Sequence, residues 1–378
     1  MKFLFTIAFA DGFHGSVVHV YELARYFISK GHSCTVATIY CDQNIKSMYD
    51  QAGIDMVLLD QIDTKREYDV LFGIHFPTVS YLLNHKIRIK KLVLNCLSRI
   101  ELLEMFPAYY SAAGMLLTCS EKVRNDMHTT YNIPLEDIEA LENLIPDEFA
   151  VYSRVHRQSP EYPSRIAVVS NHIPEEVMEL KDIMPDSEIT FFGVQTGNYQ
   201  KITPELLDGF DVVISIGKTI QYAMGLGIPA YEYDRFGGNG YITTDNMDTE
   251  AWFNFAGRNT CRKLTSWQIK DELLMQYRSC VEQQPQLKEM ALQRFLMSSR
   301  LDRLLEDIEE MPAFDYAALN KCKYNPAIDL NTGEMFCFYV HNSKNTLQNK
   351  EDHIARLESA VKNWNKTTGY WLNTMQIL

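Results

Sequence analysis

The chain has 378 residues, of which 46% are apolar and 22% are charged. This composition is that of an ordinary globular protein and excludes a long disordered or collagen-like chain. Lys and Arg number 36 against 49 Asp and Glu, and the resulting net charge of −13 argues against nucleic acid as the main partner. A chain of this length is expected to form two domains of about 100–200 residues each.

The eight cysteines are scattered, without a C-x-x-C pair or a close group with histidine. The sequence therefore signals neither a disulfide framework nor a zinc site, and we expect a reducing, cytoplasmic location. The apolar run at residues 3–10 imitates a signal peptide, but such segments run to about 15–30 residues. No apolar run reaches the roughly 18 residues of a membrane-spanning helix.

The first forty residues predict a βαβ unit: a strand at Phe3–Ala8, a loop at Asp11–Ser16, an amphipathic helix at Val17–Ser29 and a strand at Ser33–Ile39. Further strands are predicted at Met56–Leu59, Asp69–Ile74, Lys91–Cys96 and Gly114–Cys119. Long segments separate these strands, and this alternation is typical of a parallel, doubly wound α/β sheet.

A second series of the same kind follows the polar, proline-bearing stretch Tyr152–Ser164, which we interpret as a linker. Its predicted strands are Arg165–Ser170, Glu188–Phe192, Asp211–Ile216 and Pro229–Tyr233, and its predicted helices are Pro174–Lys181, Pro204–Leu207 and Lys218–Gly225. We therefore expect a first domain over residues 1–150, a second over residues 165–310, and a partly helical C-terminal extension over residues 311–378.

The C-terminal third is expected to be mostly helical from Ser266 to Glu310 and irregular over Tyr324–Gly333. In the charged segment at residues 345–363, an apolar stripe predicts either a coiled coil with a protein partner or a second copy, or an ordinary surface helix; it consists of Leu347, Ile354, Leu357 and Val361. A basic cluster indicates either contact with anionic lipid or a solvated strand entry; it consists of Lys86, Arg88, Lys90 and Lys91.

Several motifs carry a resemblance to a known family. The first domain contains Gly12-Phe13-His14-Gly15-Ser16, followed by Glu22-Leu23-Ala24, and a strand that ends Phe72-Gly73-Ile74-His75. The second domain contains Val169-Ser170-Asn171-His172, Ser215-Ile216-Gly217-Lys218-Thr219, and Asp234-Arg235-Phe236-Gly237-Gly238. Over about residues 1–310 the chain resembles the retaining GT-B glycosyltransferases of the glycogen-synthase-like family, especially a divergent bacterial polysaccharide branch.

This resemblance implies two Rossmann-like domains that face each other across a cleft. It also implies an enzyme that moves a sugar from a nucleotide-sugar donor onto a cell-surface glycan or a lipid-linked saccharide, with peripheral contact to the inner face of the membrane. No cofactor is expected. Enzymes of this fold generally require no divalent metal, so the positive charge that binds the phosphates is expected to come from the protein.

The three second-domain motifs each follow a predicted strand, so they should converge at the carboxyl ends of one sheet. Lys218, at the start of a helix, is the expected cation for the departing diphosphate. His75 is expected either to act in catalysis or to close its strand as a satisfied histidine. The expected donor-binding residues are Gly12, Gly15, Asn171, His172, Gly217, Thr219, Gln221, Tyr222, Arg235, Gly237, Gly238 and Arg258.

The acceptor side is less defined by the sequence. Asp11, His14 and Glu101 are all candidates for a general base, and a surface ion pair is an alternative role for Arg258. Tyr222 stands where the family commonly has a glutamate, and no second histidine follows the strand that ends at Cys96. A nucleotide-sugar 2-epimerase and a catalytically silent binding or scaffold module are therefore alternatives, whereas the absence of G-x-G-x-x-G disfavours a nicotinamide dehydrogenase.

Overall fold

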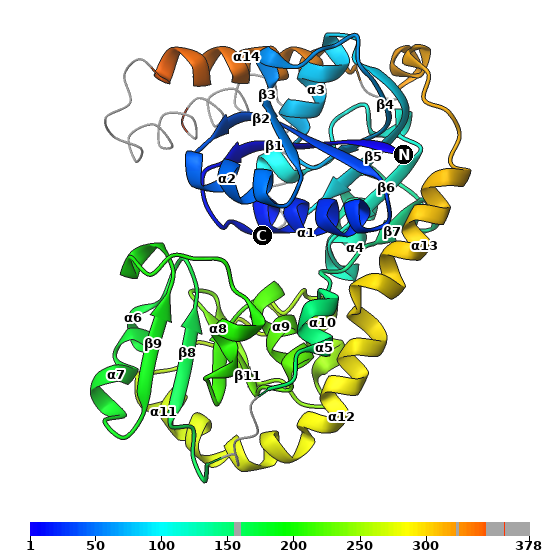
Figure 1. Cartoon of the computed structure of the whole chain (residues 1–378). Coiled ribbons are helices and arrows are strands. Elements are labelled where there is room, and N and C mark those ends of the chain that lie inside the picture. Colours follow the sequence, from blue (N-terminus) through cyan, green and yellow to red (C-terminus); the bar gives the residue numbers. More distant parts are fainter. Residues whose placement is uncertain (155–159, 323–324, 345–358, 360–378) are drawn as a thin grey trace.

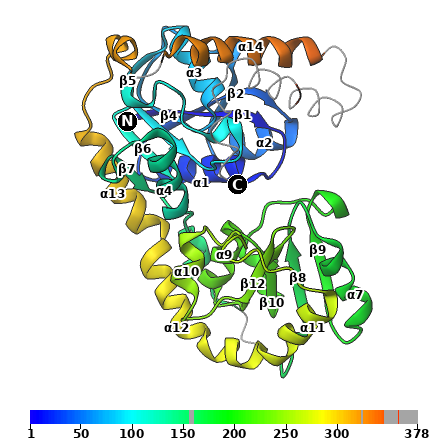
Figure 2. The same cartoon turned by 180° about the vertical axis from the view of Figure 1, so that it is seen from behind.

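A computed structural model describes residues 1–154, 160–322, 325–344 and 359 of the protein. Two α/β units lie one above the other, and long helices join them along one flank (Figures 1 and 2). The predicted linker falls partly outside the described residues, and the apolar stripe predicted in the charged segment lies entirely outside them. Within the described residues no helix is both long and apolar enough to cross a membrane.

The first unit is built on a seven-stranded sheet in the order β3-β2-β1-β4-β5-β6-β7, and all its neighbouring strands are parallel. The strands are β1 Lys2–Ala10, β2 Ser33–Cys41, β3 Asp55–Leu58, β4 Glu67–Gly73, β5 Arg88–Cys96, β6 Met115–Thr118 and β7 Ile138–Ala140. The connecting helices are α1 Gly15–Ser29, α2 Gln43–Gln51, α3 Phe76–Asn84 and α4 Glu121–Tyr131. The predicted parallel, doubly wound sheet is confirmed.

Both faces of this sheet are covered, as its sequence requires. Along β1, Phe3, Phe5 and Ile7 pack in one core cluster with α1, while Leu4 and Ala8 pack in the other cluster with α3. Side chains of a strand alternate between the two faces, so a strand that is apolar at every position is buried on both. The carboxyl ends of these strands are thereby held rigidly at the edge that faces the second unit.

The second unit has a five-stranded sheet in the order β12-β11-β10-β8-β9, parallel except for the antiparallel pair β11 and β12. Its strands are β8 Arg165–Val169, β9 Glu188–Phe192, β10 Val212–Ser215, β11 Ala230–Asp234 and β12 Gly237–Tyr241. Its helices are α6 Glu175–Met178, α7 Leu180–Ile183, α8 Pro204–Asp208, α9 Lys218–Leu226, α10 Met247–Trp252 and α11 Ser266–Met275, and α5 Asp147–Val151 leads into it. The glycine-rich segment that the sequence places after a strand is itself strand β12.

The chain passes between the two units twice. Helix α12 Tyr277–Phe295 lies against the second unit, and after Leu296 helix α13 Met297–Glu310 continues along the first. At the crossing, the amide of Ile145 donates to the carbonyl of Phe295 (2.8 Å) and the amide of Met297 donates to the carbonyl of Ile145 (2.9 Å). The predicted helical character of Ser266–Glu310 is confirmed.

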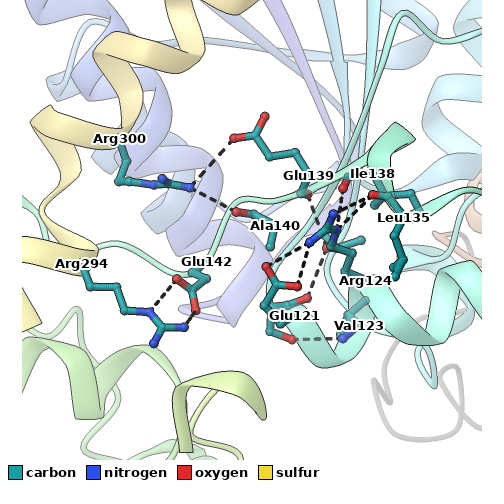
Figure 3. A network of polar contacts seen from close by, with 12 residues as sticks. Glu121, Val123, Arg124, Leu135, Ile138, Glu139, Ala140, Glu142, Arg294 and Arg300 are labelled. Carbon is teal, nitrogen blue, oxygen red and sulfur yellow. Dashed lines mark hydrogen bonds and ion pairs between the residues drawn. The ribbon is translucent and has the colours of Figure 1, made fainter. Parts of the chain in front are cut away.

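Arginines on the long helices tie this crossing together (Figure 3). Arg294 on α12 forms a two-pronged pair with Glu142, at 3.0 and 2.6 Å, and also contacts Asp248 at 2.6 Å. Arg300 on α13 donates to the carbonyl of Ala140 at 3.3 Å. Bidentate guanidinium–carboxylate pairs fix relative orientation as well as adding energy, so the two units are held in a defined arrangement.

The tail differs from the sequence-based expectation. Tyr324–Gly333 was predicted to be irregular, but helix α14 Ala327–Lys344 begins inside it and packs on α3, where Phe336, Cys337 and Val340 are buried. A Cβ at Gly333 would lie 2.5 Å from the amide nitrogen of Tyr81 and 2.6 Å from the carbonyl of Pro77. The glycine that disfavours a helix locally is the residue that lets the two helices approach closely, so tertiary packing overrides propensity.

The basic cluster is largely engaged within the molecule. Lys90 pairs with Asp69 at 2.7 Å and Glu67 at 3.1 Å, and Lys91 donates to the last-turn carbonyls of α13 at Ile308 and Glu309, both at 2.6 Å. Lys86 lies over the ring of Tyr316 at 4.7 Å. A cation at the C-terminal end of a helix is favoured by the helix dipole, so Lys91 has a structural role.

Candidate functional site

A cavity of about 400 Å³ lies between the two units at the carboxyl ends of both sheets. In doubly wound sheets this edge is where ligands bind. Of the residues proposed from sequence, seven line the cavity: Gly15, Asn171, His172, Gly217, Lys218, Thr219 and Tyr222.

The second unit presents the N-terminus of helix α9 to this cavity. Gly217, the residue before the helix, has φ of +60°, a region that side chains disfavour, and its amide donates to the carbonyl of Phe255 at 2.6 Å. No side chain caps α9. The amides at the start of a helix point along its axis, so this end of α9 offers donors and a positive dipole to a ligand in the cavity.

The first unit presents a second helix N-terminus, that of α1. Gly15 and Ser16 line the cavity, and the preceding residue His14 makes no side-chain capping bond. A Cβ at Gly15 would meet no atom within 4 Å, so this backbone is open to a close approach. Two helix N-termini without side-chain caps, one from each unit, thus face one cavity.

Lys218 is tied to the first unit through a carboxylate. Its Nζ lies 2.6 Å from Oε2 of Glu22 on α1, and the hydroxyl of Tyr222 donates to Oε1 of the same carboxylate. Lys218 is 12% exposed and Glu22 is 5% exposed. Burial, reinforced by Glu22, raises the pKa of Tyr222 well above its ordinary value, so the phenol stays protonated and keeps donating.

His19 lies beside this pair and lines the same cavity. Its Nε2 accepts from the side-chain amide of Asn95 at 3.0 Å. Burial, with a further effect from Lys218, lowers the pKa of His19 to about 3. The imidazole is therefore neutral at physiological pH and too weakly basic to hold a proton there.

Tyr199 of the second unit closes the cavity against the glycine loop of the first. Its ring lies edge-on to Phe13, with centroids 5.4 Å apart. A Cβ at Gly12 would lie 2.7 Å from the Tyr199 hydroxyl oxygen. Gly12 therefore makes room for an interdomain contact, while Gly15 remains open toward the cavity.

His75 stands behind the cavity wall. It is buried at the start of α3, and its Nδ1 accepts from the amide of Ala8 at 2.8 Å. Its Nε2 lies 3.6 Å from Oε1 of Glu104, and it is Glu104 that lines the cavity. His75, which was proposed from sequence, therefore does not line the cavity itself and contacts Glu104, which does.

The remaining proposed donor residues lie outside the cavity lining. Gln221 is buried and donates to the carbonyl of Asn143 at 2.7 Å. Gly237 and Gly238 are packed on main chain, where a Cβ would lie 2.3 Å from the Arg262 carbonyl oxygen and 1.8 Å from the Glu232 carbonyl oxygen, respectively. These glycines allow the β11–β12 turn to be built.

Arg235 and Arg258 both lie over the ring of Phe236, next to the cavity-lining Asp234. Their guanidinium carbons lie 4.8 and 4.1 Å from the centroid of Phe236. Burial and the neighbouring Arg235 lower the pKa of Arg258, which remains a cation at physiological pH. The stack holds two positive charges on the second unit beside the strand ends.

A buried carboxyl pair lies beneath this turn. Glu232 accepts from the amide of Gly257 at 2.7 Å, and Glu250 accepts from the side-chain amide of Asn239 at 2.8 Å. Burial and the proximity of Glu250 raise the pKa of Glu232 to about 8. Two carboxyls that share a buried space cannot both ionise cheaply, so the pair holds a proton at neutral pH.

His19, Glu22, Glu104 and Tyr199 are among the residues of the site that were not proposed from sequence. Glu22 is part of the opening motif Glu22-Leu23-Ala24, but its partners lie about 200 residues away. Glu104 comes from the irregular loop after β5, where Ser98 Oγ accepts from the amides of Ile100 and Glu101 at 3.1 and 3.2 Å. That turn carries no sequence signal of a site.

The two facing α/β units with a cavity at their strand ends define the GT-B fold, and solved structures confirm it. A glycosyltransferase from Rickettsia africae is 13% identical, with 82% of this chain and 98% of that chain covered and a TM-score of 0.52. The TarM protein of S. aureus, solved with UDP, is 11% identical, with 82% and 100% covered and a TM-score of 0.50. No sequence-family model matches the chain, and no curated protein matches it either.

Proposed function

We propose that the protein is a glycosyltransferase that moves a sugar from a nucleotide-sugar donor to a saccharide or lipid-linked saccharide acceptor of a cell-surface glycan. The donor diphosphate binds at the start of α9, where Gly217, Lys218 and Thr219 line the cavity. Charge that develops on the leaving diphosphate is stabilised by Lys218 and by the helix dipole, without reorganisation during the reaction. The glycogen-synthase-like, bacterial polysaccharide character of the motifs and a cytoplasmic location are parts of this proposal.

One observation carries the proposal: two helix N-termini without side-chain caps, from opposite units, face the same cavity. Backbone amides at such ends are suited to an anion, and a nucleoside diphosphate is an anion of matching size for a cavity of about 400 Å³. Of the two solved GT-B structures, the one from Rickettsia africae is a glycosyltransferase and the one of TarM contains UDP. Their likeness to this chain supports the donor class.

The testing experiment has two stages. Thermal unfolding is first measured with UDP-, GDP-, dTDP- and CMP-sugars, because a donor that binds the native state at 100 times its Kd stabilises it by about 2.7 kcal/mol. The stabilising donor is then incubated with saccharide acceptors, and release of nucleoside diphosphate is measured. Acceptor-dependent release supports transfer, whereas binding without release, with or without acceptor, identifies a silent binding module.

A nucleotide-sugar 2-epimerase is the second candidate, and one observation favours it. Such an enzyme needs acid–base carboxyls in the cleft, and both Glu104 and Asp234 line the cavity. Burial raises the pKa of Asp234, which accepts from the Ser170 hydroxyl at 3.2 Å. Conversion of the donor to its epimer in the absence of any acceptor, followed by NMR, would select this function over transfer.

A further inference from the structure

We propose that Glu104 is the acceptor-side general base of this site and that His75 is the residue that positions it. The inference rests on the proposed function, since it assigns the proton acceptor for the same glycosyl transfer. It concerns a carboxylate that the sequence motifs do not mark, in place of the candidates Asp11, His14 and Glu101.

The hydrogen bonds of His75 fix which nitrogen carries its proton. The main-chain amide of Ala8 has only a hydrogen to offer, so Nδ1 of His75 accepts in the 2.8 Å contact. The neutral imidazole therefore carries its proton on Nε2, the nitrogen that faces Oε1 of Glu104 at 3.6 Å. His75 is thus a donor toward the cavity, and a donor cannot take a proton from a substrate hydroxyl.

The second histidine of the first unit at the cavity is also excluded as the base. His19 accepts from Asn95 through Nε2, and burial, with a further effect from Lys218, lowers its pKa to about 3, so it is too weak a base to take the proton. The carboxylate of Glu22 is occupied by Lys218 and Tyr222. Among the described residues of the first unit that line the cavity, Glu104 is the carboxylate.

A backbone hydrogen bond and the partial burial of its side chain hold Glu104 in position. It closes the short helical turn Leu102–Glu104, its amide donates to the carbonyl of Glu101 at 3.0 Å, and its side chain is 18% exposed. One carboxylate oxygen faces the Nε2 proton of His75, and the lone pairs that remain are available to a hydroxyl in the cavity. Cys119, which also lines the cavity, is a neutral thiol, because burial raises its pKa to about 12.

In this proposal the sugar is transferred in a single step. The acceptor oxygen forms a bond to the anomeric carbon of the donor sugar on the side opposite the diphosphate, as the bond from that carbon to the diphosphate oxygen breaks. This step inverts the anomeric configuration, in place of the retention that the family resemblance implies. The electron pair of the broken bond leaves with the nucleoside diphosphate, which the start of α9 and Lys218 stabilise. The hydroxyl proton of the acceptor passes to the Glu104 carboxylate and is later released to water.

The test uses Glu104→Gln, which preserves shape and removes the proton acceptor. The expected result is a fall in kcat of about 10²–10⁴-fold, with donor-induced thermal stabilisation equal to that of the wild type. Added formate should restore part of the turnover of Glu104→Ala, which a merely structural role would not allow. Glu136→Gln, an exposed carboxylate of the same unit, is the matched control and should keep wild-type turnover.

The role of His75 is tested by its effect on kcat alone. His75→Leu should lower kcat while leaving the KM for the donor unchanged. His75→Gln should recover part of the lost kcat, because it restores an N–H donor. Added to Glu104→Gln, His75→Leu should lower kcat little further, because the two residues act as a unit. Wild-type kcat in Glu104→Gln, a change confined to the acceptor KM, or loss of turnover in Glu101→Gln instead would overturn the proposal. A wild-type protein that binds donor but transfers nothing would sink the proposed function itself, and the assignment of Glu104 with it.

Discussion

Replacement of Lys218 tests whether the cation of the site is also a structural tie between the two units. A lysine on an open surface would change stability by about 0.5 kcal/mol, but Lys218 is 12% exposed and pairs with Glu22, which is 5% exposed, at 2.6 Å. Lys218→Met keeps the aliphatic stem and removes the charge. It leaves a buried carboxylate held by Tyr222 alone.

The expected magnitude follows from that burial. Removal of one partner from a buried pair costs about 3–5 kcal/mol, because the other charge stays uncompensated. Removal of a preorganised contact to developing charge costs about 10²–10³-fold in kcat. Lys218→Met should therefore lose stability and turnover together.

The double variant separates the two effects. Glu22→Gln still accepts from Tyr222 but needs no cation, so Lys218→Met/Glu22→Gln should regain about 2–3 kcal/mol relative to the sum of the single changes. Its turnover should stay low, because the cation for the diphosphate is still missing. Urea unfolding and nucleoside diphosphate release at saturating donor measure the two quantities on the same preparations.

Lys90→Met is the matched control. Lys90 also pairs with a carboxylate, Asp69 at 2.7 Å, but its side chain is 56% exposed, so Lys90→Met should change stability far less than Lys218→Met and leave turnover on a soluble acceptor unchanged. Near wild-type turnover in the double variant would refute the reasoning, because Lys218 would then act only as a tie. A loss below about 1 kcal/mol in Lys218→Met would contradict the buried pair.

Two further predictions concern stability. Because the folded state raises the pKa of Glu232 from 4.5 to about 8, folding takes up a proton between these values and the contribution of Glu232 to stability falls as pH rises, by up to about 1.4 kcal/mol per pH unit. Glu232→Gln should therefore exceed the wild type in urea midpoint at pH 8.5 and lose this advantage at pH 4.5; equal pH slopes for both proteins would contradict the shared proton. Gly333→Ala should lower the unfolding midpoint even though alanine favours a helix by about 1 kcal/mol, since its Cβ would meet the main chain of α3 at 2.5 Å. Gly209→Ala, with its nearest contact at 3.5 Å, is the control, and a stabilised Gly333→Ala would show that α14 does not lie this close to α3.

The α/β alternation could be predicted from sequence because it depends on local patterns. Strands such as β1 and β10 are mostly apolar, and the glycine before α9 comes two residues after the end of its strand. The segment at β12 and the start of α14 could not be predicted in the same way. In both, the glycines are explained by main chain from elsewhere in the molecule, such as Arg262 against Gly237 and Pro77 against Gly333.

The residues of the candidate site also differ in whether a local sequence pattern or a distant contact places them. Gly217 and Lys218 stand in one motif, Tyr222 follows on the same helix, and all three line the cavity. Their partner Glu22 is separated from Lys218 by 196 residues, and the pairing exists only because the two units meet. Glu104 is likewise placed by a turn and a neighbouring histidine, neither of which leaves a periodic pattern in the sequence.

The double crossing of the chain determines the order in which the protein can be completed on the ribosome. The described residues between 146 and 296 belong to the second unit, whereas the core of the first unit includes Leu301, Leu304 and Ile308 of α13 and Phe336 of α14. Domains generally fold as units during synthesis, starting from the N-terminus. Here the unit that emerges first must wait for helices α13 and α14, so the nascent protein carries an open apolar sheet face while its second unit is already able to close.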